Sequence, residues 1–253
     1  MLKTRNGLVV LVFLLLGQMA GGQEITVAAA SDLLFVMPEI TGLFQKNTGE
    51  SVKVVYGSSG NLFQQIQSGA PFDLFFSANL EYAKKLVTAG VAEPGSIDRY
   101  AMGKIVIWVP AGSKVDLAKG LAALAEPAVR KIAIANPEHA PYGEAAVAAL
   151  KKENIYGRVA DRLVLGENIA QAASFVVSGA ADAGIIALSL AVLPEMKGKG
   201  SYVEIPAADY PAIEQGCVIV KASQKKEAAR IFLKFVKTPA VASIFRRYGF
   251  GVP

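Results

Sequence analysis

The alternation of strand-like and helix-like segments is the feature that most restricts how this sequence can fold. Segments 24–30, 51–57 and 71–78 are short and apolar, and each is followed by a stretch with apolar residues at helical spacing. This order predicts an α/β fold with mainly parallel sheets flanked by helices. Within the first helical stretch, 32–49, Pro38 predicts a kink or a late helix start, because proline cannot donate a backbone hydrogen bond.

The same rhythm starts again in the middle of the chain, which has 253 residues and is long enough for one large domain or two small ones. The two sets of units meet in strand-like segments near 104–108 and 214–218, and not in flexible linkers. We therefore expect two lobes hinged by crossing strands. The predicted division places 23–107 and 217–253 in lobe 1 and 108–216 in lobe 2.

The first 22 residues have a different character from the rest. Lys3 and Arg5 precede an apolar run at 7–17, and small residues follow it. This is the pattern of a secretory signal peptide, here residues 1–22, with cleavage before Gln23. A membrane anchor is the alternative, but the run is shorter than the roughly 20 residues that span a bilayer. We therefore expect export to the periplasm.

Composition argues against several classes of function. The formal net charge is only +5 and the basic residues are scattered, whereas nucleic-acid binding usually needs a concentrated basic face. The single cysteine, Cys217, lies in a strand-like segment and is expected to be a small buried side chain. One cysteine and one histidine cannot build a typical zinc site, so we expect no cofactor and no direct ligands for a metal cation.

Four turns share one pattern, in which a strand leads through small or polar residues into a helix. They contain Ser31, Ser59, Tyr142 and Asn168, and Gln171 follows Asn168 at capping-box spacing. The first amides of a helix have no acceptor within it and lie at the positive end of its dipole, so they attract anions. Each turn alone is explained by ordinary capping. Together, at strand ends of two lobes, they predict one small anion site.

Catalysis is the second interpretation of the same residues. A serine hydrolase would have to use His139, the single histidine, with a serine such as Ser59. The Gly57-Ser58-Ser59-Gly60 turn does not match the Gly-x-Ser-x-Gly nucleophile motif. A lone histidine beside a proline in a loop more often has a structural role. Replacement of His139 by alanine separates the two interpretations.

Several motifs resemble those of periplasmic molybdate-binding proteins of ABC importers. They are "ITVAAASDL", "YGSSGNLFQQIQSGAPFDLFFSA", "IAIANPEHAPYG" and the closing "IFRRYGF", and the resemblance covers essentially the whole mature chain. The resemblance implies a type II periplasmic binding protein fold, in which two lobes close on a tetrahedral oxyanion. It also implies a protein without catalysis that delivers its ligand to a membrane permease.

The resemblance also implies a role for each residue of the expected site. Ser31 and Ser59 match serines that donate hydroxyl and amide hydrogens, and Tyr142 and Ile169 match positions that donate backbone amides. Asp32 is expected to turn its carboxylate away from the anion, toward the helix start, and to leave its amide in the site. Ala187 stands where one branch of the family has a tyrosine donor, so the Tyr142 hydroxyl is expected to compensate.

The ligand is expected to be molybdate or tungstate, and the sequence does not separate these two. A cavity of donors would reject a protonated anion such as hydrogen phosphate, because the proton would lack an acceptor. Sulfate carries no proton and has to be excluded by size, so a sulfate-binding protein remains an alternative. The expected partners are the oxyanion and the permease of an ABC transporter, with the protein acting as a monomer.

Overall fold

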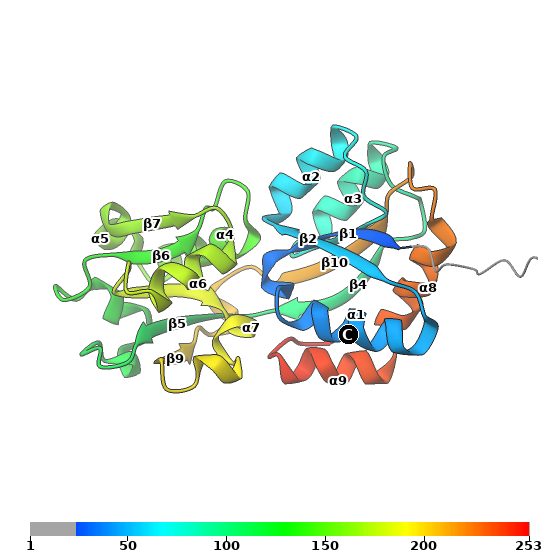
Figure 1. Cartoon of the computed structure of the whole chain (residues 1–253). Coiled ribbons are helices and arrows are strands. Elements are labelled where there is room, and N and C mark those ends of the chain that lie inside the picture. Colours follow the sequence, from blue (N-terminus) through cyan, green and yellow to red (C-terminus); the bar gives the residue numbers. More distant parts are fainter. Residues whose placement is uncertain (1–23, 253) are drawn as a thin grey trace, which may run out of the picture.

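The computed structural model describes residues 24–252, which form two lobes that lie side by side (Figure 1). The first lobe is built on a five-stranded sheet in the order β2-β1-β3-β10-β4, and the second on a five-stranded sheet in the order β7-β6-β8-β5-β9. Helices flank both sheets. The predicted two-lobed α/β fold is confirmed.

The elements of the first lobe come from both ends of the chain. Its strands are β1 (Ile25–Ala30), β2 (Val52–Gly57), β3 (Leu74–Ser77), β4 (Asp98–Gly103) and β10 (Ile213–Ile219). Its helices are the 3-10 turn η1 (Ser31–Leu33), α1 (Val36–Thr48), α2 (Ser59–Gln67), α3 (Leu80–Thr88), α8 (Lys226–Val236) and α9 (Pro239–Arg247).

The second lobe is a continuous middle part of the chain. Its strands are β5 (Ile105–Pro110), β6 (Ile132–Ala135), β7 (Leu163–Gly166), β8 (Ala183–Ala187) and β9 (Gly200–Glu204). Its helices are α4 (Pro141–Lys152), α5 (Tyr156–Val159), α6 (Ile169–Val177) and α7 (Leu188–Ala191), with the 3-10 segments η2 (Leu117–Ala125), η3 (Ala160–Arg162), η4 (Pro194–Met196) and η5 (Ala207–Asp209).

Both sheets are mixed, whereas the sequence predicted mainly parallel ones. β1 pairs in parallel with β2 and β3, and β10 pairs antiparallel with β3 and β4. In the second sheet β6 is parallel to β7 and β8, while β5 is antiparallel to β8 and β9. The antiparallel pairs arise because the chain leaves the first lobe through β4 and returns through β10. Strands β4 and β9 were not predicted.

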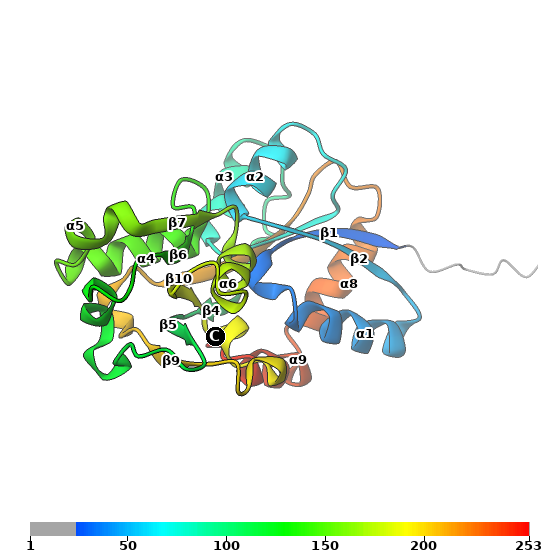
Figure 2. The same ribbon diagram turned by 60° about the vertical axis from the view of Figure 1, so that its left-hand side comes forward.

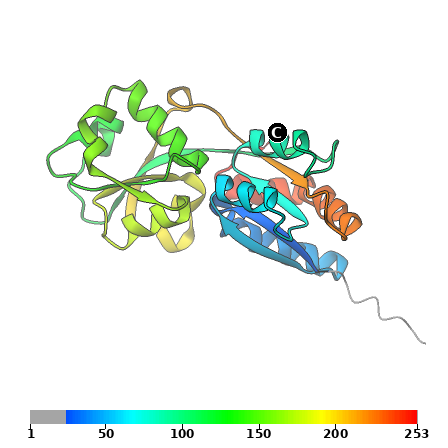
Figure 3. The same ribbon diagram turned by 90° about the horizontal axis from the view of Figure 1, so that it is seen from above.

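Two crossings join the lobes, as the view from above shows (Figure 3). Lys104 alone separates β4 from β5, and residues 205–212 connect β9 to β10. The division predicted at 107/108 falls inside β5, and the one predicted at 216/217 falls inside β10. Helix α6 contacts η1 at the boundary between the lobes (Figure 2).

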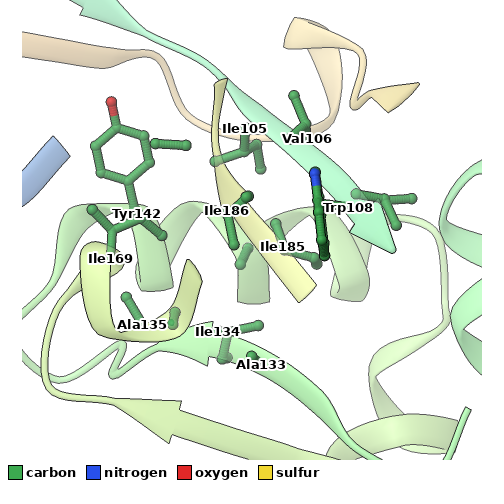
Figure 4. Packing of buried hydrophobic residues seen from close by; sticks show 14 of the residues in the cluster. Ile105, Val106, Trp108, Ala133, Ile134, Ala135, Tyr142, Ile169, Ile185 and Ile186 are labelled. Carbon is green, nitrogen blue, oxygen red and sulfur yellow. The ribbon is translucent and has the colours of Figure 1, made fainter. Parts of the chain in front are cut away.

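Helices cover both faces of the first sheet, which explains why its strands β1 and β3 are almost continuously apolar. Ile25, Val27 and Ala29 pack with α1, α8 and α9 on one face, whereas Ala28 packs with α2 and α3 on the other. Figure 1 shows these two helix layers above and below the sheet. The second sheet has a core around Trp108, shown in Figure 4.

Several local predictions are confirmed. Helix α1 begins at Val36, so Pro38 lies in its first turn, where a missing amide does little harm. Helix α9 begins after Thr238, whose side chain accepts a hydrogen bond from the Val241 amide. Cys217 is 2% exposed.

The structure also bears on the membrane question. Within residues 24–252 no helix combines the length and the apolar character needed to cross a membrane. The predicted signal peptide, residues 1–22, lies outside the described part of the chain.

Substitution of Gly143 by alanine is expected to destabilise the protein. A Cβ atom there would lie 2.1 Å from the carbonyl oxygen of Ala135, so α4 would have to move away from β6. Overpacking of this kind costs about 1–3 kcal/mol, measurable by urea unfolding. Gly157→Ala is the matched control, because no atom lies within 4 Å of the added Cβ. Equal unfolding midpoints for the two variants would contradict the prediction.

Candidate functional site

The residues predicted to bind an anion line one cavity between the two lobes. Its wall includes Ser31, Ser59, Tyr142 and Ile169, which come from both lobes. The cavity measures about 10 Å³, close to the minimum that holds one water molecule. An anion with four oxygens therefore requires the surrounding groups to move outward. A larger surface hollow of about 700 Å³, beside Phe72, contains none of these four residues.

Ser31 stands where β1 ends. It begins the single 3-10 turn η1, and the first long helix starts only at Val36. The expectation of a helix start at Ser31 is thus corrected, and a turn this short adds little dipole field. The Ser31 hydroxyl oxygen accepts a hydrogen bond from the Ala170 amide across the lobe boundary, at 3.4 Å.

Ser59 is the first residue of α2, after Ser58 as N-cap. The Ser58 hydroxyl oxygen accepts from the Asn61 amide at 3.4 Å. The Ser59 side chain is buried, and its oxygen accepts from the Ala78 amide at 2.9 Å. Since that bond uses only a lone pair, the Ser59 hydroxyl hydrogen can be donated to an anion.

The second lobe presents the starts of α4 and α6 to the same cavity. Tyr142 follows Pro141, the first residue of α4, and Ile169 is the first residue of α6. Backbone amides at these positions have no acceptor within their own helix. Asn168 caps α6 as predicted, and its side chain accepts from the amides of Ala170 and Gln171.

The Asp32 carboxylate does not bond to the helix start, so the expected partner is corrected. This buried carboxylate lies between the lobes, where Oδ2 accepts from the Tyr142 hydroxyl at 2.9 Å and from Nε2 of Gln215 at 2.5 Å. Tyr142 is on α4 and Gln215 is on β10, so the carboxylate links both lobes and a crossing strand. The expectation fails because a neighbouring helix start is a weaker partner than two side-chain donors already facing the carboxylate.

The Tyr142 hydroxyl is therefore committed to Asp32 and accepts in turn from Gln215 Nε2 at 2.9 Å. It cannot supply the donor missing at Ala187, which corrects that expectation. In Figure 4 the Tyr142 ring lies beside Ile169, with its hydroxyl pointing away from the other labelled side chains.

Sequence reasoning missed the rest of this buried network. The Tyr100 hydroxyl donates to Oε1 of Gln215 at 2.7 Å, and the Ser189 hydroxyl donates to the backbone oxygen of Asp32 at 3.0 Å. Gln215 is fully buried. Its place before the apolar run that starts at Gly216 was the available signal, because a polar side chain in a buried strand needs partners.

His139 lies at the lobe boundary but does not pair with Ser59. Its Nδ1 atom is 2.9 Å from the hydroxyl oxygen of Ser58, and its backbone oxygen accepts from the Gly60 amide at 2.8 Å. On the other side of the ring, Nε2 is 3.8 Å from a carboxylate oxygen of Glu167. The Ser59–His139 pair of the hydrolase interpretation is not formed, and His139 instead helps to hold the lobes together.

Comparison with known proteins places the chain in a family. Residues 25–251 match the family model described as bacterial extracellular solute-binding protein. The chain is a bacterial extracellular solute-binding protein. The family predicted from the sequence motifs is thereby confirmed.

Curated relatives of this solute-binding protein include the molybdate-binding protein ModA of Rhodobacter capsulatus. The two are 37% identical over 231 residues, which is 91% of this chain and 89% of the relative. Among solved structures, the periplasmic molybdate-binding protein of Azotobacter vinelandii superposes with a TM-score of 0.86. It is 36% identical, and the match covers 90% of this chain and 99% of that one. These relatives are named as binding proteins.

A more distant match shows that the fold alone does not identify the ligand. The sulfate-binding protein SubI of Mycobacterium tuberculosis superposes with a TM-score of 0.71 at 20% identity, covering 90% of this chain and 86% of that one. The fold is thus shared with a protein of different named ligand. The ligand of this solute-binding protein has to be argued from its site.

The site contains no candidate for holding a cation. Among residues 24–252 no group of three or more His, Cys, Asp or Glu side chains is arranged to bind a metal ion. The groups around the cavity are hydroxyls, amides and the Asp32 carboxyl. Such a set can bind an oxyanion by hydrogen bonds.

Burial raises the pKa of Asp32 from 3.8 to about 6, although hydrogen bonds from Gln215 and Tyr142 act in the opposite direction. Taking a carboxylate out of water disfavours its charged form, which is the larger effect here. The folded protein therefore holds a proton on Asp32 over a pH range in which the unfolded chain has lost it.

This shift makes a pH-dependent contribution to stability. The contribution of Asp32 is largest below pH 4, falls as the pH rises toward 6, and stays low above that. Asp32→Asn removes the titration, so the variant should gain about 2 kcal/mol in unfolding free energy relative to the wild type between pH 4 and pH 7. Urea unfolding at both pH values measures this. A stability difference that does not change with pH would contradict it.

Proposed function

We propose that the protein captures molybdate or tungstate between its lobes and delivers it to the permease of an ABC transporter. The observation that carries the proposal is the meeting of Ser31, Ser59, Tyr142 and Ile169 around one cavity between the lobes. Relatives named as molybdate-binding proteins, at 37% and 36% identity over about nine-tenths of the chain, support the choice of ligand.

The donors suit a buried dianion. Ser31 and Ser59 offer hydroxyls, and the positions at Ser59, Tyr142 and Ile169 offer amides at helix starts. Each hydrogen bond to a charged acceptor contributes about 1.5–3 kcal/mol. These bonds replace the hydration that the dianion loses, since burial of a charge is costly without them. The net affinity is what remains after dehydration and ordering of the lobes.

Selectivity has two parts. Exclusion of sulfate would come from size, with molybdate and tungstate as the larger ions. Exclusion of hydrogen phosphate cannot rest on donors alone, since Asp32, a residue with acceptor oxygens, is part of the cavity wall. A sulfate-binding protein is the second candidate, supported by the fold shared with SubI.

The family points to a place outside the cytoplasmic membrane, where such proteins meet their transporters. We propose export through the signal peptide at residues 1–22 and action as a monomer in the periplasm. The single anion cavity is formed by one chain, so ligand capture needs no second copy.

Calorimetry with sodium molybdate, tungstate, sulfate and phosphate at pH 7 tests the ligand. Under this proposal molybdate and tungstate should bind with submicromolar Kd, and sulfate, the smaller ion, at least about a hundredfold more weakly. Stronger binding of sulfate would favour the second candidate. No heat and no thermal shift with either metal oxyanion would overturn the proposal.

Ser31→Ala and Ser59→Ala should each weaken molybdate binding about 10- to 150-fold, because each removes one hydroxyl donor to a charged ligand. Calorimetry of the folded variants measures the change in Kd. Ser174→Ala is the control, as Ser174 is an exposed serine of α6. If either buried serine could be replaced without loss of affinity, its hydroxyl would not be a ligand donor.

Gly60→Ala should weaken binding at least about tenfold by preventing closure. An added Cβ would lie 2.7 Å from the His139 backbone oxygen in the other lobe, so the boundary would have to open. Gly42→Ala, on α1, is the matched control, because nothing lies within 4 Å of its added Cβ. Kd values for molybdate measure the effect, and an unchanged value for Gly60→Ala would show that the contact is not needed.

A further inference from the structure

The two oxygens of the Asp32 carboxyl have different surroundings. Oδ2 accepts two hydrogen bonds, from the Tyr142 hydroxyl and from Gln215 Nε2. Oδ1 is buried and has no hydrogen-bond partner among residues 24–252. Asp32 lines the anion cavity together with Ser31 and Ser59. A buried polar atom without a partner is rare in proteins and needs an explanation, such as a bound water molecule or ion.

An ionised Asp32 would oppose the proposed ligand. A carboxylate and a dianion in one water-poor cavity repel each other strongly, because little solvent screens them. An ionised carboxylate also has no hydrogen to donate, so its unpartnered oxygen could not bond to a fully deprotonated anion. A protonated carboxyl removes both difficulties.

The groups that face Asp32 do not supply a compensating positive charge. Gln215 on β10 and Ser189 on α7 are uncharged. The titratable groups are the hydroxyls of Tyr142 on α4 and Tyr100 on β4, and burial, followed by the nearby Asp32, holds the pKa of both well above 10. Since both tyrosines stay neutral at physiological pH, Asp32 is the group in this network that can change its charge there.

We propose that Asp32 binds the oxyanion as a neutral acid, with one proton taken from solvent onto Oδ1 and donated to a ligand oxygen. The inference rests on the proposed function and deepens it. The two donors on Oδ2 leave Oδ1 as the oxygen that carries the proton, and the dianion is the acceptor that Oδ1 lacks. Capture of one dianion is then coupled to uptake of one proton, and Asp32 becomes a determinant of affinity.

The pH dependence follows from burial. Without ligand the pKa of Asp32 is about 6, raised by desolvation, so most molecules are ionised at pH 8. The bound dianion stabilises the protonated form further. At a pH above the Asp32 pKa of the free protein, anion binding must therefore include protonation of Asp32. The affinity for the anion should then fall about tenfold for each pH unit above 7.

The test is calorimetry with sodium molybdate from pH 6 to pH 8.5, at constant ionic strength, in buffers of different ionisation enthalpy. The wild type should take up about one proton per anion at pH 8, and its Kd should rise about tenfold per pH unit. Asp32→Asn is the matched variant: its amide can still donate but carries no titratable proton. It should bind with a nearly flat pH profile and take up no proton at this position.

Tyr142→Phe gives a second, independent readout. The Tyr142 hydroxyl bond lowers the pKa of Asp32, so its loss should move the onset of the pH dependence upward. Asp32→Asn retains His139 and all other titratable groups. Any effect of these other groups on the pH profile of binding appears equally in wild type and Asp32→Asn, so it cancels when the two profiles are compared.

The outcomes separate the two proposals. Molybdate binding without proton uptake at pH 8, or equal pH profiles for wild type and Asp32→Asn, would overturn the role of Asp32 and leave the proposed function intact. Absence of binding at every pH, in a protein shown by circular dichroism to be folded, would overturn both. The wild-type proton count decides the matter even if Asp32→Asn fails to fold.

Discussion

The structure depends on backbone amides that converge from two lobes on one buried cavity. Helices α2, α4 and α6 all begin at its wall, and each start leaves amides without acceptors in its own helix. Three positive helix ends that face one another in a space of about 10 Å³ are unfavourable without negative charge between them. A bound anion would relieve this and satisfy the amides at the same time.

The sheet topology makes this convergence possible. In both sheets the parallel strands end at the side that faces the other lobe, and the helices that follow begin there. The antiparallel strands β4, β5 and β10 carry the chain between the lobes. Gln215 on β10 and Tyr100 on β4 bring this crossing region into the hydrogen-bond network of Asp32. Binding site and crossing strands are thus physically connected.

Asp32 shows how a single carboxyl changes the chemistry of a site made of neutral donors. A donor-only cavity sorts anions by charge and size, whereas a carboxyl with a shiftable pKa lets the protein adjust its own charge to the ligand. Full burial disfavours the charged form of the Asp32 carboxyl, whereas the hydrogen bonds to Oδ2 stabilise it. The balance between these effects places the pKa near the physiological range.

The sequence by itself determined the α/β class, the two lobes and the local chemistry of the strand-to-helix turns. Apolar periodicity and capping residues such as Thr238 and Asn168 act over a few residues, so they can be read along the chain. Ser59 and Tyr142 were found in this way, with the motif resemblance adding their roles, whereas Ile169 came from the resemblance alone.

Only the tertiary structure decided how distant residues combine. The partners of Asp32 lie 110 and 183 positions away, and no local pattern specifies such contacts. The same holds for strands β4 and β9, whose pairing depends on the path between lobes, and for His139, which contacts Ser58 and not Ser59. Local sequence fixes which groups are offered at each turn, whereas burial and long-range packing fix their partners and their charge.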